Sequence, residues 1–133
     1  MTAPAPRNRY LADSVSTASP GRLLVMLYDR LVVDLGQAED ALLMGDRDTG
    51  RTRLMHAQDI VTELRASLDV EAWDGGPGLA ALYAFMLTEM VGANVTNDAA
   101  RVASCRRLVE PLRDAWREAV MSRTAETANA GRG

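Results

Sequence analysis

What this chain lacks narrows its function before any motif is considered. Lysine is absent from the 133 residues, so every basic side chain is an arginine, which we attribute to genomic codon bias. The arginines are interspersed with acidic residues, and the net charge is −3. A nucleic-acid-binding protein needs a basic face that neutralises phosphates. We therefore expect no nucleic-acid partner.

The chain also has a single cysteine, an N-terminus unlike a signal peptide and only one long apolar stretch. Cys105 is the only cysteine, so no disulfide can form within the chain, which is compatible with a reducing compartment. The N-terminus, MTAPAPRNRY, lacks the apolar core of a signal peptide. The most apolar stretch, residues 79–95, is near the short end of what a bilayer needs and contains Glu89 and Asn94. We expect a cytoplasmic protein without membrane insertion.

Histidine is limited to His56, and this excludes several kinds of site. A di-metal carboxylate site in a helical bundle needs Glu-x-x-His on two helices, whereas Arg53 stands three residues before His56. A nucleophile needs its base close by, but His56 is predicted on an outer helix face and Cys105 on an inner one. The glycines at 75–78 lack the phosphate-binding pattern GxxxxGK[ST]. We expect neither an enzyme nor a cofactor or metal.

Apolar residues recur with helical period in four segments of the chain. Ser19-Pro20 marks the first helix start, because serine can accept a hydrogen bond from an early backbone N–H and proline at the first position loses no helical bond. This helix is predicted to run to about Met44, and the others over about 49–68, 79–95 and 99–121. Short connections favour antiparallel neighbours, so the sequence predicts an all-α, antiparallel up-down four-helix bundle.

The chain divides into three parts on this interpretation. Residues 1–18 form a flexible N-terminal segment that caps the bundle, because they are rich in proline, alanine and arginine or too short and mixed for a helix. Residues 19–121 form the bundle. Residues 122–133 are small and polar and are predicted to be a disordered tail.

The third segment has more apolar surface than one core can use. Between Gly75 and Asn97 its only charged side chain is Glu89. One apolar stripe, which is enough for a surface helix, is formed by Leu79, Leu82, Tyr83, Met86, Met90 and Ala93. Leu87, Val91 and Val95 lie beside this stripe, and Phe85 lies on its other side. We interpret the surplus as surface that awaits a partner.

The order and spacing of several short motifs resemble the flagellin-specific export chaperones, the FliS family. The similarity extends from about Tyr10 to Trp116. The matching pieces are Tyr10-x4-Val15-x-Thr17-Ala18-Ser19-Pro20-Gly21-x-Leu23, Met26-Leu27-Tyr28-Asp29, Ala57-Gln58-x-Ile60-Val61-x-x-Leu64, Leu82-Tyr83-x-x-Met86, Ala93-Asn94-x-x-Asn97-Asp98 and Ala115-Trp116.

This resemblance implies a cytoplasmic chaperone that works without nucleotide. Its client would be the C-terminal segment of flagellin, which is disordered in the free monomer and wraps around the bundle, folding partly into helices. The N-terminal segment around Tyr10 would occupy part of the same surface when no client is bound. The loaded chaperone would then dock on the flagellar export gate.

Candidate client-binding residues are apolar side chains that flank or oppose the inward stripes, together with Tyr10. They are Tyr10, Val25, Met26, Val32, Val33, Ile60, Phe85, Leu87, Val91, Val95 and Leu108. Val25, Val32, Ile60, Leu87 and Leu108 could equally form a wide boundary of the core. Met26, Val33, Phe85 and Val95 are expected to be exposed. Trp116 and Tyr83 are expected in the core.

Two other functions stay open from the residues alone. A four-helix bundle with one outward histidine suggests a histidine phosphotransfer domain that uses His56. Asp59, three residues later, would repel a phosphoryl group there, so a solvated surface histidine is the simpler interpretation. The apolar faces could also serve a structural bundle that self-associates as a weak homodimer.

Overall fold

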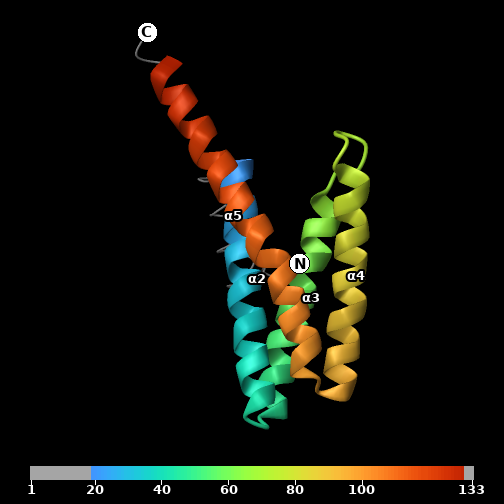
Figure 1. Cartoon of the computed structure of the whole chain (residues 1–133). Helices are drawn as coiled ribbons and strands as arrows, with labels where there is room; N and C mark the ends of the chain where they lie inside the picture. Colours follow the sequence, from blue (N-terminus) through green and yellow to red (C-terminus); the bar gives the residue numbers. More distant parts are fainter. Residues whose placement is uncertain (1–18, 131–133) are drawn as a thin grey trace, which may run out of the picture.

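The computed structural model describes residues 19–130, with side chains through Ala125, and contains four helices and no strand in this part. The helices are α2 (Pro20–Leu43), α3 (Arg47–Ser67), α4 (Gly76–Thr96) and α5 (Ala99–Ala130). Successive helices run in opposite directions in chain order (Figure 1), so the predicted all-α antiparallel bundle is confirmed. The predicted flexible segment 1–18, including Tyr10, lies outside the described residues.

Side-chain caps mark the starts of α2 and α3. Ser19 Oγ accepts a hydrogen bond from the Arg22 N–H at 3.2 Å, as the sequence predicts for the start of α2. The start of α3 comes earlier than predicted because Asp46 is its cap and accepts a hydrogen bond from the Thr49 N–H at 3.2 Å. Hydrogen bonds from the Thr49 side chain and then from its backbone N–H lower the pKa of the Asp46 carboxyl. The start of α4 is also earlier, since Gly76 and Pro77 belong to its first turn.

The end of α5 differs most from the prediction. The helix continues to Ala130 instead of ending at Met121, so residues 122–130, which the sequence analysis assigns to a disordered tail, are helical. The stretch SRTAETANA contains neither glycine nor proline, and the next residue is Gly131. Figure 1 shows this end of α5 projecting past the other three helices.

The four helices form a closed sequence of neighbours around one core. α2 packs against α3 and α5, and α4 packs less extensively against α3 and α5. Ion pairs join α2 to α5: Arg106 Nε lies 2.8 Å from Glu39, and Asp29 lies 2.6 Å from Arg117 Nη2 and 3.8 Å from Arg113 Nε. The core residues are Tyr28, Leu31, Leu35, Ala38, Leu54, Ala57, Ile60, Val61, Leu64, Leu79, Tyr83, Met86, Met90, Ala93, Val102, Cys105 and Val109.

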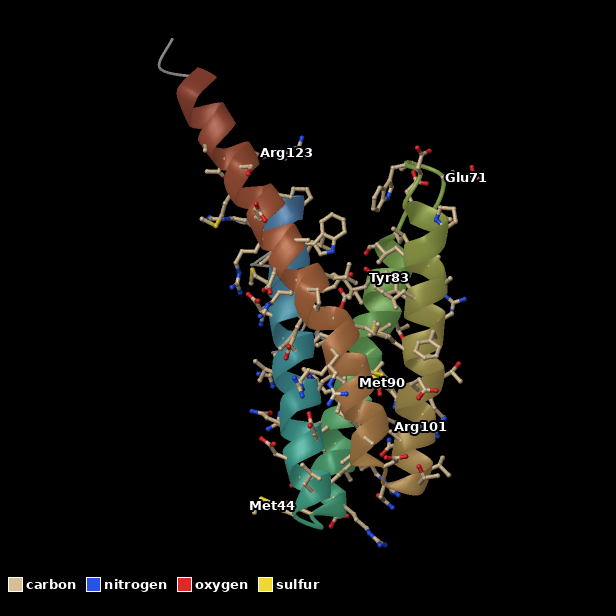
Figure 2. The ribbon with its side chains drawn as sticks, in the orientation of Figure 1. Met44, Glu71, Tyr83, Met90, Arg101 and Arg123 are labelled. Carbon is tan, nitrogen blue, oxygen red and sulfur yellow. The ribbon has the colours of Figure 1, made fainter. Side chains whose placement is uncertain are left out.

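Helix α4 is long and apolar enough to cross a membrane by length and composition, a test that core helices of soluble proteins also pass. Its inward stripe is the one that the sequence predicts. Tyr83, Met86 and Met90 are buried in the bundle, and Figure 2 shows Tyr83 and Met90 directed between the helices. The helix therefore contributes a full core face and still has apolar side chains left over.

Candidate functional site

The outer face of α4 exposes three large apolar side chains. Val95 is 76% exposed, and Phe85 and Val91 are each 50% exposed. Leu87 is partly buried and packs against the core. Because apolar residues surround this helix, one face fills the core while another meets solvent. The expected exposure of Phe85 and Val95 is confirmed.

The outer face of α2 and one position on α5 add to this apolar surface. Met26 and Val33, two turns apart on α2, are both exposed, as the sequence analysis expects. Val25 is partly buried, and Val32 is partly buried against the core. Leu108 on α5 is exposed.

Ile60 is a correction to the candidate surface. Its side chain is only 4% exposed and belongs to the core. Helix α3 packs against both α2 and α4, so it buries a wider face than one apolar stripe. Ile60 flanks that stripe and is covered for this reason.

A groove between α3 and α4 lies beside the exposed face of α4. It has a volume of about 560 Å³ and is lined by Arg51, Met55, Gln58, Val91, Asn94, Val95 and Asn97. We call it the α3–α4 groove. Of these residues, only Val91 and Val95 are among the predicted client-binding residues. Met55, which is 55% exposed, could have been found because it lies one turn from Arg51 on a face that carries no core residue.

A smaller cavity lies near the α3–α4 loop, at the other end of the bundle. It has a volume of about 220 Å³ and is lined by Leu24, Leu64, Ser67, Leu68, Asp69, Ala72, Trp73, Leu79, Tyr83 and Trp116. The Trp73 and Trp116 rings lie 6.1 Å apart in an edge-on arrangement. Trp73, to which the sequence analysis assigns no role, is half-exposed and packs at the mouth of this cavity.

Tyr83, which lines this cavity, is hydrogen-bonded to a second tyrosine, Tyr28. The Tyr28 and Tyr83 hydroxyl oxygens lie 2.5 Å apart in a buried hydrogen bond between α2 and α4. Burial raises the pKa of both phenols, so both remain protonated at neutral pH. Tyr83 is buried and Trp116 packs partly buried against the core, as the sequence predicts.

His56 is a second correction, because it is not simply a solvated surface histidine. Its Nδ1 contacts Oδ2 of Asp34, a carboxylate that is fully buried between α2 and α3. The other carboxylate oxygen of Asp34 lies 3.2 Å from Arg30 Nη2 and 3.9 Å from Arg53 Nη1. The Nδ1 side of the imidazole is thus engaged with a buried carboxylate, so His56 makes a structural contact between α2 and α3.

Cys105 is buried in the core, and burial raises the pKa of its thiol to about 11. The thiol is therefore protonated at neutral pH, whereas a nucleophilic cysteine needs its thiolate. Among the described residues there is no group of three or more His, Cys, Asp or Glu side chains that could hold a metal ion. The main chemical feature of this surface is exposed apolar area.

Comparisons with known proteins place the chain in a family. The family described as Flagellar protein FliS matches residues 2–123. The chain is 31% identical over 126 residues to the flagellar secretion chaperone FliS of Bacillus subtilis, covering 95% of this chain and 94% of that protein. It is 32% identical over 112 residues to the flagellar secretion chaperone FliS of Escherichia coli, covering 83% and 82%.

The fold also matches a solved structure. The crystal structure of a bacterial flagellar chaperone superposes with a TM-score of 0.71 and 20% identity, covering 86% of this chain and 94% of that one. At this identity the match supports the fold alone. On the sequence matches, the chain belongs to the FliS family of flagellar secretion chaperones, which are not enzymes.

Proposed function

We propose that this chain binds the C-terminal segment of flagellin in the cytoplasm, prevents its premature polymerisation and helps to deliver it to the flagellar export gate. The observation that carries the proposal is the apolar area left uncovered on α2, α4 and α5. The predicted client-binding residues that are exposed there are Met26, Val33, Phe85, Val91, Val95 and Leu108, and Leu43 and Met121 are exposed as well.

The proposal follows from what a disordered client requires. Ordering the client backbone costs about 1–2 kcal/mol per residue. Coupled folding and binding recovers this cost by burying roughly 1,000–3,000 Å² of surface. Exposed apolar residues on three different helices offer contacts along a long path instead of at one point. Flexible methionine side chains such as Met26 can adapt to an incoming helix.

The N-terminal segment is proposed to compete with the client. Residues 1–18, with Tyr10, are attached to the start of α2 at Pro20. Leu24, one turn into α2, lines the cavity beside Trp73. An aromatic side chain from a segment tethered this close could enter that end of the bundle and be displaced when a client binds.

Neighbouring residues on α4 provide a matched test. We expect Phe85→Glu and Val95→Glu to weaken binding of a flagellin C-terminal peptide by roughly tenfold or more, because each removes buried apolar contact worth about 1.5–3 kcal/mol. Both variants should keep the thermal melt of the wild-type chain. Met86→Glu should unfold the bundle, because Met86 is fully buried. Calorimetric titration and circular dichroism measure these effects.

The outcomes separate the surface from the function. A wild-type chain that binds no flagellin peptide would overturn the proposed function. Binding that Phe85→Glu and Val95→Glu leave unchanged would overturn the assigned surface. If these variants unfold the bundle, the residues belong to the core.

Self-association through the same exposed residues is the alternative that the apolar surface also fits. Sedimentation of the free chain would reveal a weak homodimer. A dimer that dissociates when the flagellin peptide is added supports the chaperone, because both partners then use one surface. A dimer that the peptide does not affect supports a structural bundle.

A further inference from the structure

The α3–α4 groove differs in charge from the rest of the molecule. Its walls combine apolar side chains from Met55, Val91 and Val95 with the amides of Gln58, Asn94 and Asn97. Arg51 is its one charged residue, and no acidic residue lines it. A groove with a single positive charge is thus set in a chain whose net charge is −3.

The charge of Arg51 is not neutralised within the described part of the chain. Arg53, two residues on, contacts the buried Asp34, and Arg101 on α5 pairs with Glu89 at 3.2 Å. Asp98, which follows Asn97, accepts hydrogen bonds from the first N–H groups of α5. No carboxylate of residues 19–125 lies at ion-pair distance from Arg51, which is itself exposed.

We propose that the α3–α4 groove takes one amphipathic helix of the exported client, and that this helix carries a carboxylate about one turn from its apolar anchors. The proposal rests on the function proposed above and specifies the chemistry of one part of the client. Apolar side chains of a docked helix recur at i, i+3, i+4 and i+7, which suits contact with Met55, Val91 and Val95. The carboxylate would pair with Arg51, whose planar guanidinium can hold both oxygens.

The composition of the groove disfavours other occupants. A nucleic acid needs several basic contacts, and this groove offers one. Small-molecule sites enclose most of their ligand, whereas Met55 and Val95 on the groove walls are more than half exposed. In a symmetric dimer built on this groove, the same patch faces itself, which would bring Arg51 toward its own copy. A helix with a negative charge satisfies both the apolar and the basic residues.

Charge reversal tests the proposal against a matched arginine. The probe is a synthetic peptide with the C-terminal sequence of flagellin from the same organism, titrated at low ionic strength. We expect Arg51→Glu to weaken its binding about threefold to tenfold, because an attraction becomes a repulsion at a solvent-exposed site. Arg107→Glu makes the same charge change at an exposed α5 residue that does not line the groove, and should alter affinity less than twofold.

Two further readouts locate the effect. Added salt should weaken the wild-type complex more than the Arg51→Glu complex, because salt screens the attraction between Arg51 and the client carboxylate, which the variant lacks. On titration with the peptide, the methyl resonance of Met55 should shift. The methyl resonance of Met121, exposed on α5 outside the groove, should stay in place.

The results distinguish this inference from the function on which it rests. Suppose that the wild-type chain binds the peptide and that Arg51→Glu and Arg107→Glu lose equal affinity, or that neither loses any. Either result would overturn the groove assignment but not the proposal that flagellin is the client. An unshifted Met55 resonance in a saturated complex would also overturn it. Absence of any binding by the wild-type chain would overturn both.

Discussion

Asp34 is the residue whose environment is least typical of a helical bundle. Its side chain is fully buried on α2, where an unpaired carboxylate would be costly. His56 supplies the hydrogen bond, while Arg30 and Arg53 supply charge without hydrogen-bond geometry at Oδ1. Because His56 and Arg53 come from α3, the cluster fixes how α2 and α3 lie against each other.

Removing the imidazole tests this role. We expect His56→Ala to destabilise the fold by about 1–3 kcal/mol, because it leaves the buried Asp34 oxygen without its hydrogen-bond donor. Asp59→Ala, an exposed position on the same helix, should stay within about 0.5 kcal/mol of the wild type. Urea unfolding followed by circular dichroism measures both. Equal stability of the two variants would contradict a structural role for His56.

The buried cluster could have been suspected from the sequence, but its members could not be identified. Leu31 and Leu35 point inward, and Asp34 lies between them at a spacing that places it on the same face. Helical period alone thus puts a carboxylate in the core. Which residue of another helix satisfies it depends on how the two helices are aligned, and a single helical pattern does not contain that information.

At the scale of elements, the glycines at the start of α4 have unequal roles. A Cβ at Gly76 would lie 2.1 Å from the carbonyl oxygen of Val70, so the backbone of the α3–α4 loop passes too close for any side chain. A Cβ at Gly78 would meet nothing within 4 Å. The cluster of glycines predicts a loop, yet only one of these two is required by packing.

Alanine substitutions should separate these two glycines. We expect Gly76→Ala to destabilise the fold by roughly 1–3 kcal/mol, because overpacking forces the loop backbone to shift. Gly78→Ala should stabilise it by roughly 0.5–1 kcal/mol, because alanine is the better helix former inside the first turns of α4. Thermal and urea unfolding of both variants check the signs. A Gly76→Ala variant as stable as Gly78→Ala would show that the loop can move away at little cost.

The helices themselves were largely predictable, and the misses have local causes. Ser19-Pro20 fixed the first start because capping is a short-range effect. The predicted starts at about 49 and 79 come late, because the first turns of α3 and α4 lie before the apolar residues that define the helical period. The end of α5 was placed early because small polar residues resemble a tail, although none of residues 122–130 breaks a helix. The prediction that Ile60 belongs to the client-binding surface is wrong, because burial of a residue beside the apolar stripe depends on how many helices pack against its own helix.

At the scale of the molecule, the four helices differ in how extensively they pack against their neighbours. α2 has extensive contacts with α3 and α5, and ion pairs from Glu39 and Asp29 connect it to α5. α4 has fewer contacts with its neighbours, and Glu89 with Arg101 is the ion pair that α4 makes among the described residues. α4 also carries the exposed Phe85, Val91 and Val95. The helix with the most uncovered apolar surface is therefore also the one packed least firmly against the rest.

This inequality predicts the pattern of amide hydrogen exchange. In the free chain, we expect mid-helix amides of α4 to exchange faster than those of α2, because local opening costs least where buried contacts are few. Adding the flagellin C-terminal peptide should slow exchange in α4 more than in α2, since the client supplies the contacts that α4 lacks. Mass spectrometry of peptic fragments measures both helices in one experiment, so the protection of α4 is compared directly with that of α2, which also carries exposed apolar residues. Protection that rises equally in all four helices would indicate general stabilisation of the fold, and would contradict a client seated on α4.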